Sequence, residues 1–158
     1  MPVPIRVRRG PDLAPAQLYA LLRLRTDVFV VEQECPYPEL DGQDLLPGTV
    51  HLWIEDGAEG GAPRRVLATI RILGADGARP VIGRVATAAD ARGRGLAARL
   101  LEHGIGRCDA GSPIGLHAQA HLEGWYRRFG FLRDGDPYLE DGIPHVPMLR
   151  PRAAVEEA

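Results

Sequence analysis

Three short apolar segments follow one another closely near the middle of the chain, and this run constrains the fold more than any other feature. The segments cover Thr49 to Glu55, Arg65 to Leu73 and Val81 to Thr87, with turns rich in glycine and proline between them. Strands joined by short turns pair antiparallel, because a parallel partner needs a long crossover connection. We therefore expect an antiparallel meander and not a sheet built only from βαβ units.

A helix is expected before this run. Pro15 suits the first turn of a helix, and leucines recur at helical spacing from Leu18 towards Phe29. Arg23 and Arg25 are expected on the other faces of this helix. A polar loop rich in acidic residues, 39–48, then leads to the first strand of the run.

The remaining segments complete a mixed pattern. Helices are expected from Leu96 to Ile105 and from Ala120 to Phe129, the second closed by Gly130 in a left-handed conformation. Further strands are expected at 3–9, 114–119, 131–132 and 145–150, with a loop at 134–144. The order β-α-β-β-β-α-β-α-β-β describes an α/β fold with one mixed sheet. Pro147 conflicts with the last strand, because proline is normally confined to sheet edges.

Size and charge limit the organisation and the partners of the chain. Its 158 residues are enough for one hydrophobic core, so we expect a single domain over 1–150 and a loose tail over 151–158. The net charge of −2 offers no cationic surface to nucleic acid or to an anionic membrane, and no apolar run is long enough to span one. The first residues do not resemble a signal peptide, so a cytoplasmic location is expected. The oligomeric state is left open, with a homodimer allowed.

Residue usage excludes several chemistries. All 19 basic residues are arginine, so a P-loop lysine and a lysine Schiff base are both ruled out. Ser112 is the only serine and lies in a Gly-Ser-Pro turn, while Cys35 and Cys108 are expected to be free thiols. His117 and His121 have the spacing of a helical metal pair, but we expect the first in a strand and the second in a helix. No metal site is therefore predicted.

The loop after the last strand of the run carries the strongest functional signal. A strand ends at Thr87, and a helix begins on the glycines of Arg92-Gly93-Arg94-Gly95. Glycine lets the backbone approach a ligand closely, and the first amides of a helix have no partner within the helix. With the helix dipole and the two arginines, these amides form a site suited to phosphate or pyrophosphate.

Two other interpretations of this loop are open. Gly93-x-Gly95-x-x-Ala98 also matches a relaxed dinucleotide-binding fingerprint. That fingerprint follows the first strand of a βαβ unit and needs an acid at the end of the next strand. Here three antiparallel strands come first, and the strand at 114–119 ends without an acid. The segment can also be explained as a helix-capping turn alone.

The same residues resemble a known family. Arg92-x-x-Gly95-x-Ala97 is similar to the acyl-CoA pyrophosphate loop of the GNAT superfamily, the GCN5-related N-acetyltransferases. The run Trp125-Tyr126-Arg127-Arg128-Phe129-Gly130-Phe131 resembles the late helix of that family. Within the family, residues 24–44 and Ile143-Pro144-His145 resemble the ElaA-like branch. The resemblance covers nearly the whole chain and implies the GNAT-type acyl-CoA N-acyltransferase fold.

This resemblance implies an N-acetyltransferase that moves an acetyl group from acetyl-CoA to an amine by direct attack in a ternary complex. It implies that Tyr126 protonates the departing thiolate and that the acceptor is a small-molecule or peptide amine. The implied cofactor-binding residues are the backbone of Val85, Ala86 and Thr87 for the pantetheine arm, and Arg92, Gly93, Arg94, Gly95, Leu96 and Ala97 for the pyrophosphate. A non-catalytic acyl-CoA-binding or sensing module is the alternative.

The residue that would act as general base is left open. Five acids and three histidines flank the expected cleft: Glu34, Asp41, Asp44, Glu140, Asp141, His51, His117 and His145. Histidine is suited to proton transfer near neutral pH, although a lone histidine is more often structural. The acids of 32–34 and 41–44 either favour a cationic amine at the rim of the cleft or cap turns in a solvated loop.

Overall fold

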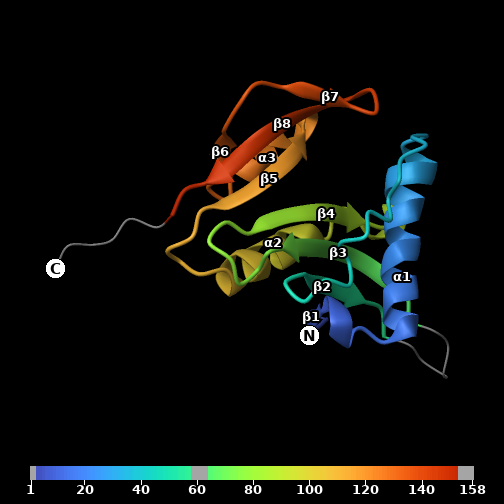
Figure 1. Ribbon diagram of the computed structural model, residues 1–158. Coiled ribbons are helices and arrows are strands. Elements are labelled where there is room, and N and C mark those ends of the chain that lie inside the picture. The colour runs from blue at the N-terminus through green and yellow to red at the C-terminus, as the bar shows by residue number, and fades with distance from the viewer. Residues whose placement is uncertain (1–2, 58–63, 153–158) are drawn as a thin grey trace.

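Figure 1 shows the computed structural model, which describes residues 3–57 and 64–152. Its strands are β1 (Arg6–Arg9), β2 (Val50–Glu55), β3 (Val66–Leu73), β4 (Val81–Thr87), β5 (Ile114–Gln119), β6 (Leu132–Arg133), β7 (Tyr138–Glu140) and β8 (Ile143–Arg150). Its helices are α1 (Pro15–Thr26), the π-helical segment η2 (Asp27–Glu32), α2 (Leu96–Arg107) and α3 (Glu123–Arg127), with 3-10 turns at Gly10–Asp12, Ala89–Ala91 and Ala120–Leu122. One mixed sheet runs in the order β1-β2-β3-β4-β5-β8-β6, and β7 pairs with β8. The predicted α/β fold with a mixed sheet is confirmed, with β7 as an additional strand.

The predicted meander is present, and its middle strand, β3, pairs antiparallel with both β2 and β4. Ile70 and Ile72 point towards α2, where Gly104 permits close packing: a Cβ there would lie 2.8 Å from Ile70 Cδ1. Successive side chains of a strand point to opposite faces, so Thr69 and Arg71 lie on the other face, which α1 covers. Because helices cover both faces, β3 is buried along nearly its whole length.

The C-terminal strands form the other part of the sheet, where β8 lies between β5 and the pair β6 and β7. The prediction of a loop at 134–144 is therefore wrong in part, because this segment contains β7. Pro147 is accommodated inside β8 because β6 and β7 leave a gap opposite it. The Asp134 backbone N–H donates to the Pro147 carbonyl across 2.8 Å, and glycine at 135 leaves space for the ring, since a Cβ there would lie 2.9 Å from Pro147 Cγ.

The third helix is shorter than predicted. Leu122 has φ −100° and ψ 1°, which is not helical, so the segment 120–129 divides into a 3-10 turn and α3. Gly130 has a φ of 91°, the left-handed conformation expected of it. In the part of the chain that the structure describes, no helix is both long enough and apolar enough to cross a membrane. Most of the predicted tail at 151–158 lies outside the described residues.

Candidate active site

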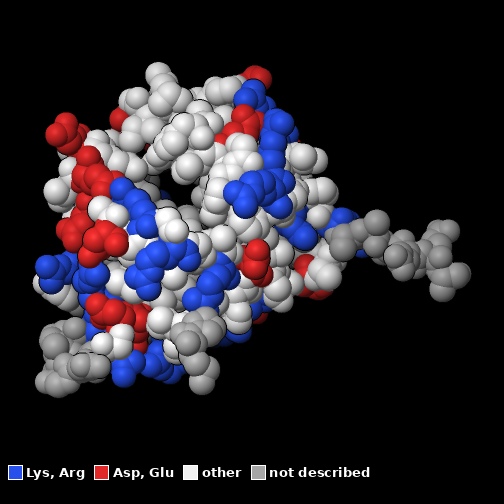
Figure 2. Space-filling model, turned by 180° about the vertical axis from the view of Figure 1, so that it is seen from behind, with Lys and Arg blue, Asp and Glu red and all other residues white. Residues whose placement is uncertain are grey.

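A cleft opens where β4 and β5 diverge. These parallel strands pair at a single position, Val81 with Gly115, and then separate (Figure 1). The cleft has a volume of about 1040 Å³, and Figure 2 shows the surface hollowed between the two parts of the sheet. That volume lies just above the range of about 300–1,000 Å³ usual for small-molecule and cofactor sites. The edge of β4 beyond Val81 is left without a strand partner on the β5 side, so an extended ligand can pair with it.

The loop after β4 presents backbone amides to this cleft. Gly93 and Gly95 have φ values of 82° and 72°, a left-handed conformation that glycine adopts without strain. Gly95 is the N-cap of α2, so the first amides of that helix point out of the helix without internal partners. With the helix dipole, such amides can bind an anion, which is the role that the sequence predicts for this loop.

The structure brings nearly all of the predicted site residues together. Those that line the cleft are Val85, Ala86, Thr87, Arg92, Gly93, Gly95, Leu96, Ala97 and Tyr126. Arg94 is the exception, because it is exposed and does not line the cleft. Among the candidate bases, Asp41, His117, Glu140, Asp141 and His145 line the cleft, whereas Glu34, Asp44 and His51 do not.

Arg92 already has an anionic partner in this structure. Its Nη2 donates to both carboxylate oxygens of Glu32, at 2.9 and 2.7 Å, and its Nε donates to the Thr87 carbonyl at 3.3 Å. Glu32 is the last residue of η2, the π-helical continuation of α1. The sequence analysis expected helical spacing only towards Phe29, but the π-helical turns continue to Glu32 and bring its carboxylate to the loop after β4.

A cluster of arginines and acids forms one side of the cleft, and the sequence analysis missed it. Arg25 does not lie on an outer face of α1, because its side chain is only 1% exposed. Its Nε donates to Glu39 and its Nη1 to Asp44, both at 2.6 Å. The spacing contained the signal, since Arg25 follows Leu21 by four residues and precedes Val28 by three, and both of these are buried. The arginine–carboxylate cluster consists of Arg25, Glu39, Asp41, Asp44, Arg71 and Arg84.

This cluster also fixes the shape of β4. The register between β3 and β4 shifts from the pair Thr69–Ala86 to the pair Arg71–Gly83, which indicates a β-bulge. Arg84, inside the bulge, has a φ of 50°, a conformation that costs energy for a residue with a side chain. Its guanidinium bonds to Glu39, with Nε 3.0 Å from Oε1. The buried ion pairs therefore hold the strained backbone next to the free edge of β4.

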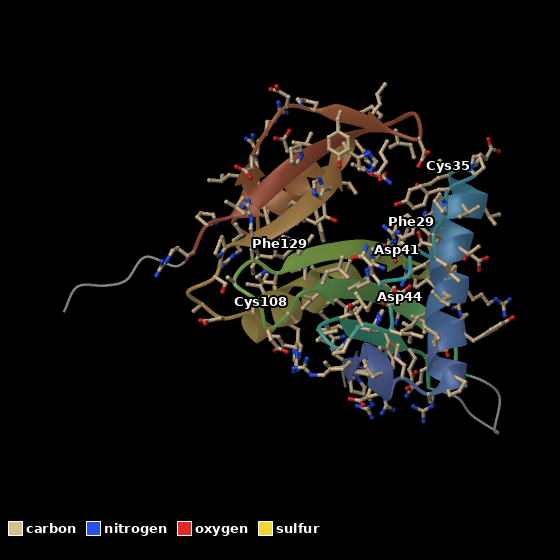
Figure 3. All side chains as sticks on the ribbon, in the orientation of Figure 1. Phe29, Cys35, Asp41, Asp44, Cys108 and Phe129 are labelled. Atoms are coloured by element: carbon tan, nitrogen blue, oxygen red, sulfur yellow. The ribbon has the colours of Figure 1, made fainter. Side chains whose placement is uncertain are left out.

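The acids of the cluster are paired with arginines. Although burial opposes it, hydrogen bonds and the charges of Arg25 and Arg71 lower the pKa of Asp44. Hydrogen bonds from Arg71 likewise lower the pKa of Asp41, again against the effect of burial. Burial lowers the pKa of His51, whose Nε2 lies 2.9 Å from the Asp44 carbonyl. Figure 3 shows Asp41 and Asp44 beside α1. Asp44 is buried, whereas Asp41 accepts from the Gln43 backbone N–H at 3.1 Å, which is the turn-capping role that the sequence analysis left open.

Tyr126 closes the cleft from the side of α3. It is 6% exposed and packs edge-to-face against Trp125, with ring centroids 4.9 Å apart, and against Phe131 at 6.2 Å. Burial raises the pKa of its phenol, so the hydroxyl remains protonated at neutral pH. A protonated hydroxyl in a cleft can donate a proton to a departing group.

A second group of polar side chains faces the cleft from β5, β7 and β8. Tyr138 Oη lies 2.9 Å from His117 Nδ1, and the Tyr138 ring stacks on that of His145, with centroids 5.7 Å apart. Cys35 Sγ lies 3.6 Å from the Asp141 carbonyl. This contact joins the chain after η2 to the turn between β7 and β8 (Figure 3). Cys35 and Cys108 are both free, as predicted, and both are buried.

Several known proteins are similar in sequence to this chain. The family model of the acetyltransferase (GNAT) domain matches residues 65–150. A UPF0039 protein of Mycobacterium tuberculosis is 50% identical over 150 residues, which cover 89% of this chain and 88% of that protein. Protein ElaA of Escherichia coli is 41% identical over 146 residues, which cover 88% of this chain and 90% of ElaA.

Solved structures agree with the sequence relatives. The crystal structure of an acyl-CoA N-acyltransferase from Pseudomonas aeruginosa has a TM-score of 0.84 and 42% identity, covering 94% of this chain and 99% of that one. The crystal structure of Escherichia coli ElaA has a TM-score of 0.81 and 37% identity with the same coverage. The protein is thus an acyl-CoA-dependent acyltransferase, and its chain belongs to the GNAT family, in the ElaA-like branch.

Proposed function

We propose that this acyltransferase is an N-acetyltransferase that transfers the acetyl group of acetyl-CoA to an amine by direct attack in a ternary complex. One observation carries the proposal: the free edge of β4 leads directly to the amides at the start of α2, and both line one cleft with Tyr126. An edge for an amide-bearing arm, an anion site and a proton donor are the parts that acetyl transfer from a CoA thioester needs.

The binding roles follow from the positions of the backbone groups. The main chain of Val85, Ala86 and Thr87 would pair with the pantetheine arm, so their side chains matter little. The amides of the loop and of the first turn of α2 would bind the pyrophosphate, supported by the guanidinium of Arg92. Arg94, exposed and outside the cleft lining, would contribute by its charge near the site and not by a contact inside it.

The chemistry needs one proton donor and one proton acceptor. Acetyl-CoA supplies a thioester carbonyl carbon and a thiolate leaving group. Tyr126 would give its phenolic proton to that thiolate, which is worth typically ~10²–10⁴ in rate. A covalent intermediate on the protein is not needed. Cys108 does not line the cleft, and burial raises the pKa of its thiol, so it is a poor nucleophile.

Binding to the loop can be tested with Gly95→Glu. A side chain at a φ of 72° is strained, and the new carboxylate would repel the pyrophosphate, so we expect no measurable binding of acetyl-CoA by calorimetry. Gly106→Glu is the matched control, since it adds the same charge to the outer side of α2, where a Cβ meets nothing within 4 Å. Equal affinity of both folded variants would contradict the assignment of the loop.

A measurement of turnover distinguishes the proposed enzyme from a non-catalytic acyl-CoA-binding module. We expect the wild-type protein to release CoA thiol from acetyl-CoA when primary amines are added, at a rate that depends on the amine. A panel of polyamines, amino acids and peptides with free N-termini tests this and identifies the class of acceptor. Binding of acetyl-CoA without thiol release for any amine would overturn the proposed activity and leave a sensing module.

A further inference from the structure

We propose that His145 is the general base of this reaction, taking a proton from the ammonium group of the acceptor through Nε2. This inference rests on the proposed function. An amine with a pKa of about 10 is neutral in only about one molecule in a thousand at pH 7, so a proton acceptor next to the bound amine has a large effect on the rate. The backbone hydrogen bond of His145 and the side chains around its ring prepare it for that role.

The backbone fixes the tautomer of His145. Its Nδ1 lies 2.7 Å from the carbonyl oxygen of Ile143. A carbonyl oxygen only accepts hydrogen bonds, so Nδ1 must carry the hydrogen. The neutral ring then has its lone pair at Nε2, which is the atom a general base needs. Ile143 and His145 both belong to β8, so the residue that selects the tautomer is part of the sheet and not of a mobile side chain.

Neighbouring side chains hold the ring and would stabilise its cation. The ring of Tyr138 stacks on that of His145 at an interplanar angle of 24°, which fixes its plane. Glu140 Oε2 lies 3.7 Å from His145 Nε2, so an imidazolium formed there would lie beside a carboxylate. The side chain of His145 is 13% exposed and lines the cleft.

Tyr138 and His117, on the same side of the cleft, are bonded to each other. Burial raises the pKa of Tyr138, and the nearby Glu140 and Tyr37 act in the same direction, so its hydroxyl stays protonated. His117, on β5, has its Nδ1 engaged with the Tyr138 hydroxyl at 2.9 Å, and a tyrosine hydroxyl can donate or accept, so its tautomer is not fixed. Glu140 is the one carboxylate paired with His145 in the described residues.

Strand register places His145 on the cleft face of the sheet. It lies opposite Gln119 on β5 and Tyr138 on β7, and directly paired residues of antiparallel strands point to the same face. Gln119 reaches Gln33, after η2, with Nε2 donating to Oε1 at 3.2 Å. The face that carries His145 is therefore turned towards η2 across the cleft.

The protons balance in the proposed step. The acceptor enters as an ammonium ion and gives one proton to His145 Nε2, which passes it to solvent. The neutral amine nitrogen then bonds to the thioester carbonyl carbon, and the carbon–sulfur bond breaks. The thiolate takes the phenolic proton of Tyr126, and the second proton of the nitrogen restores that phenol. The products are an acetamide, CoA thiol and one released proton.

His145→Asn tests the proposal, because an asparagine amide can still donate to the Ile143 carbonyl but does not accept a proton at neutral pH. The probes are ethylamine, which is protonated at pH 7, and trifluoroethylamine, which is largely neutral there. We expect kcat/KM for ethylamine to fall by ~10²–10⁴ and that for trifluoroethylamine to fall far less. His103→Asn, an exposed substitution on α2 away from the cleft, is the control and should change neither.

A second readout does not depend on turnover. Imidazole ¹⁵N chemical shifts of the wild-type protein should identify the Nδ1–H tautomer of His145, with a free lone pair at Nε2. An Nε2–H tautomer would overturn the proposal, as would equal losses for both amines or full activity of His145→Asn. Failure of the proposed function gives a different result: the wild-type protein would then release no CoA, whichever amine is added. The general-base proposal can therefore fail while the proposed function stands.

Discussion

At the scale of single residues, Tyr126 shows how packing prepares a proton donor. Its ring is enclosed by Trp125 and Phe131, and the resulting burial, and not a charged neighbour, raises the pKa of the phenol. A hydroxyl kept protonated in this way is available to donate at neutral pH. The same packing gives Tyr126 a structural role, so a test must distinguish the effect of losing the hydroxyl from the effect of losing the ring.

Tyr126→Phe makes that separation, since it removes the hydroxyl and keeps the ring. We expect turnover to fall by ~10²–10⁴ while the affinity for acetyl-CoA stays within a few fold. The free energy of unfolding should fall by about 1 kcal/mol or less, the value of one hydrogen bond. Steady-state thiol release and thermal melting measure the two effects. Tyr19→Phe, on a side chain that is 70% exposed, is the control, and a loss of turnover under about threefold would remove Tyr126 from the mechanism.

At the scale of elements, the contact between η2 and the loop after β4 determines how far the charge of Arg92 is available to a ligand. The π-helical end of α1 places the Glu32 carboxylate on Arg92, so the guanidinium is paired before any phosphate binds. Pyrophosphate must compete with that carboxylate or share the guanidinium with it. We therefore expect the carboxylate of Glu32 to lower the affinity of the site for CoA.

Glu32→Gln should bind acetyl-CoA about twofold to fivefold more tightly, because it frees Arg92 from a competing exposed charge. Arg92→Ala should bind it more weakly but leave the affinity for pantetheine, which lacks the pyrophosphate, unchanged. Calorimetry at low and high salt measures both, and the difference between variants should shrink with salt. Glu102→Gln, on the exposed side of α2, controls for the loss of a negative charge. Unchanged affinity of Glu32→Gln would mean that Glu32 does not compete for Arg92.

At the scale of the whole molecule, the arginine–carboxylate cluster joins segments that are far apart in the chain. Arg25 belongs to α1, Asp44 to the loop before β2, Arg71 to β3 and Arg84 to the bulge of β4. Three guanidinium groups meet three carboxylates, so the cluster is electrically balanced while it is complete. Removing one member leaves a buried charge without its partner.

Arg25→Ala should lower the free energy of unfolding by about 3–5 kcal/mol, the usual cost of breaking a buried ion pair. Arg23→Ala, on the exposed face of the same helix, should change it by no more than about 0.5 kcal/mol. Urea unfolding at pH 7 measures both. A cost for Arg25→Ala as small as that for Arg23→Ala would show that the cluster does not stabilise the fold.

The pH dependence of stability follows from the same pairs. The pKa of Asp44 is lower in the folded protein than its ordinary value of 3.8, so its contribution to stability is present above pH 3.8 and is lost as the pH falls through the lower folded value. Wild-type stability should therefore drop steeply in this acid range. In Arg25→Ala the drop should be shallower, because one of the two arginines that lower the pKa of Asp44 is gone.

Local sequence patterns determined most of the helices and strands. They also determined the side of the cleft that is formed by β4, the loop after it and the start of α2. The meander, the left-handed glycines at 93 and 95 and the start of α2 depend on residue type and spacing, which are local properties. Tertiary structure alone decided the partners of Arg25 and the place of Pro147 inside β8. Each of these depends on which segment lies beside another in space. Ion pairs and gaps between strands form between residues whose separation in the chain carries no information about their distance in the fold.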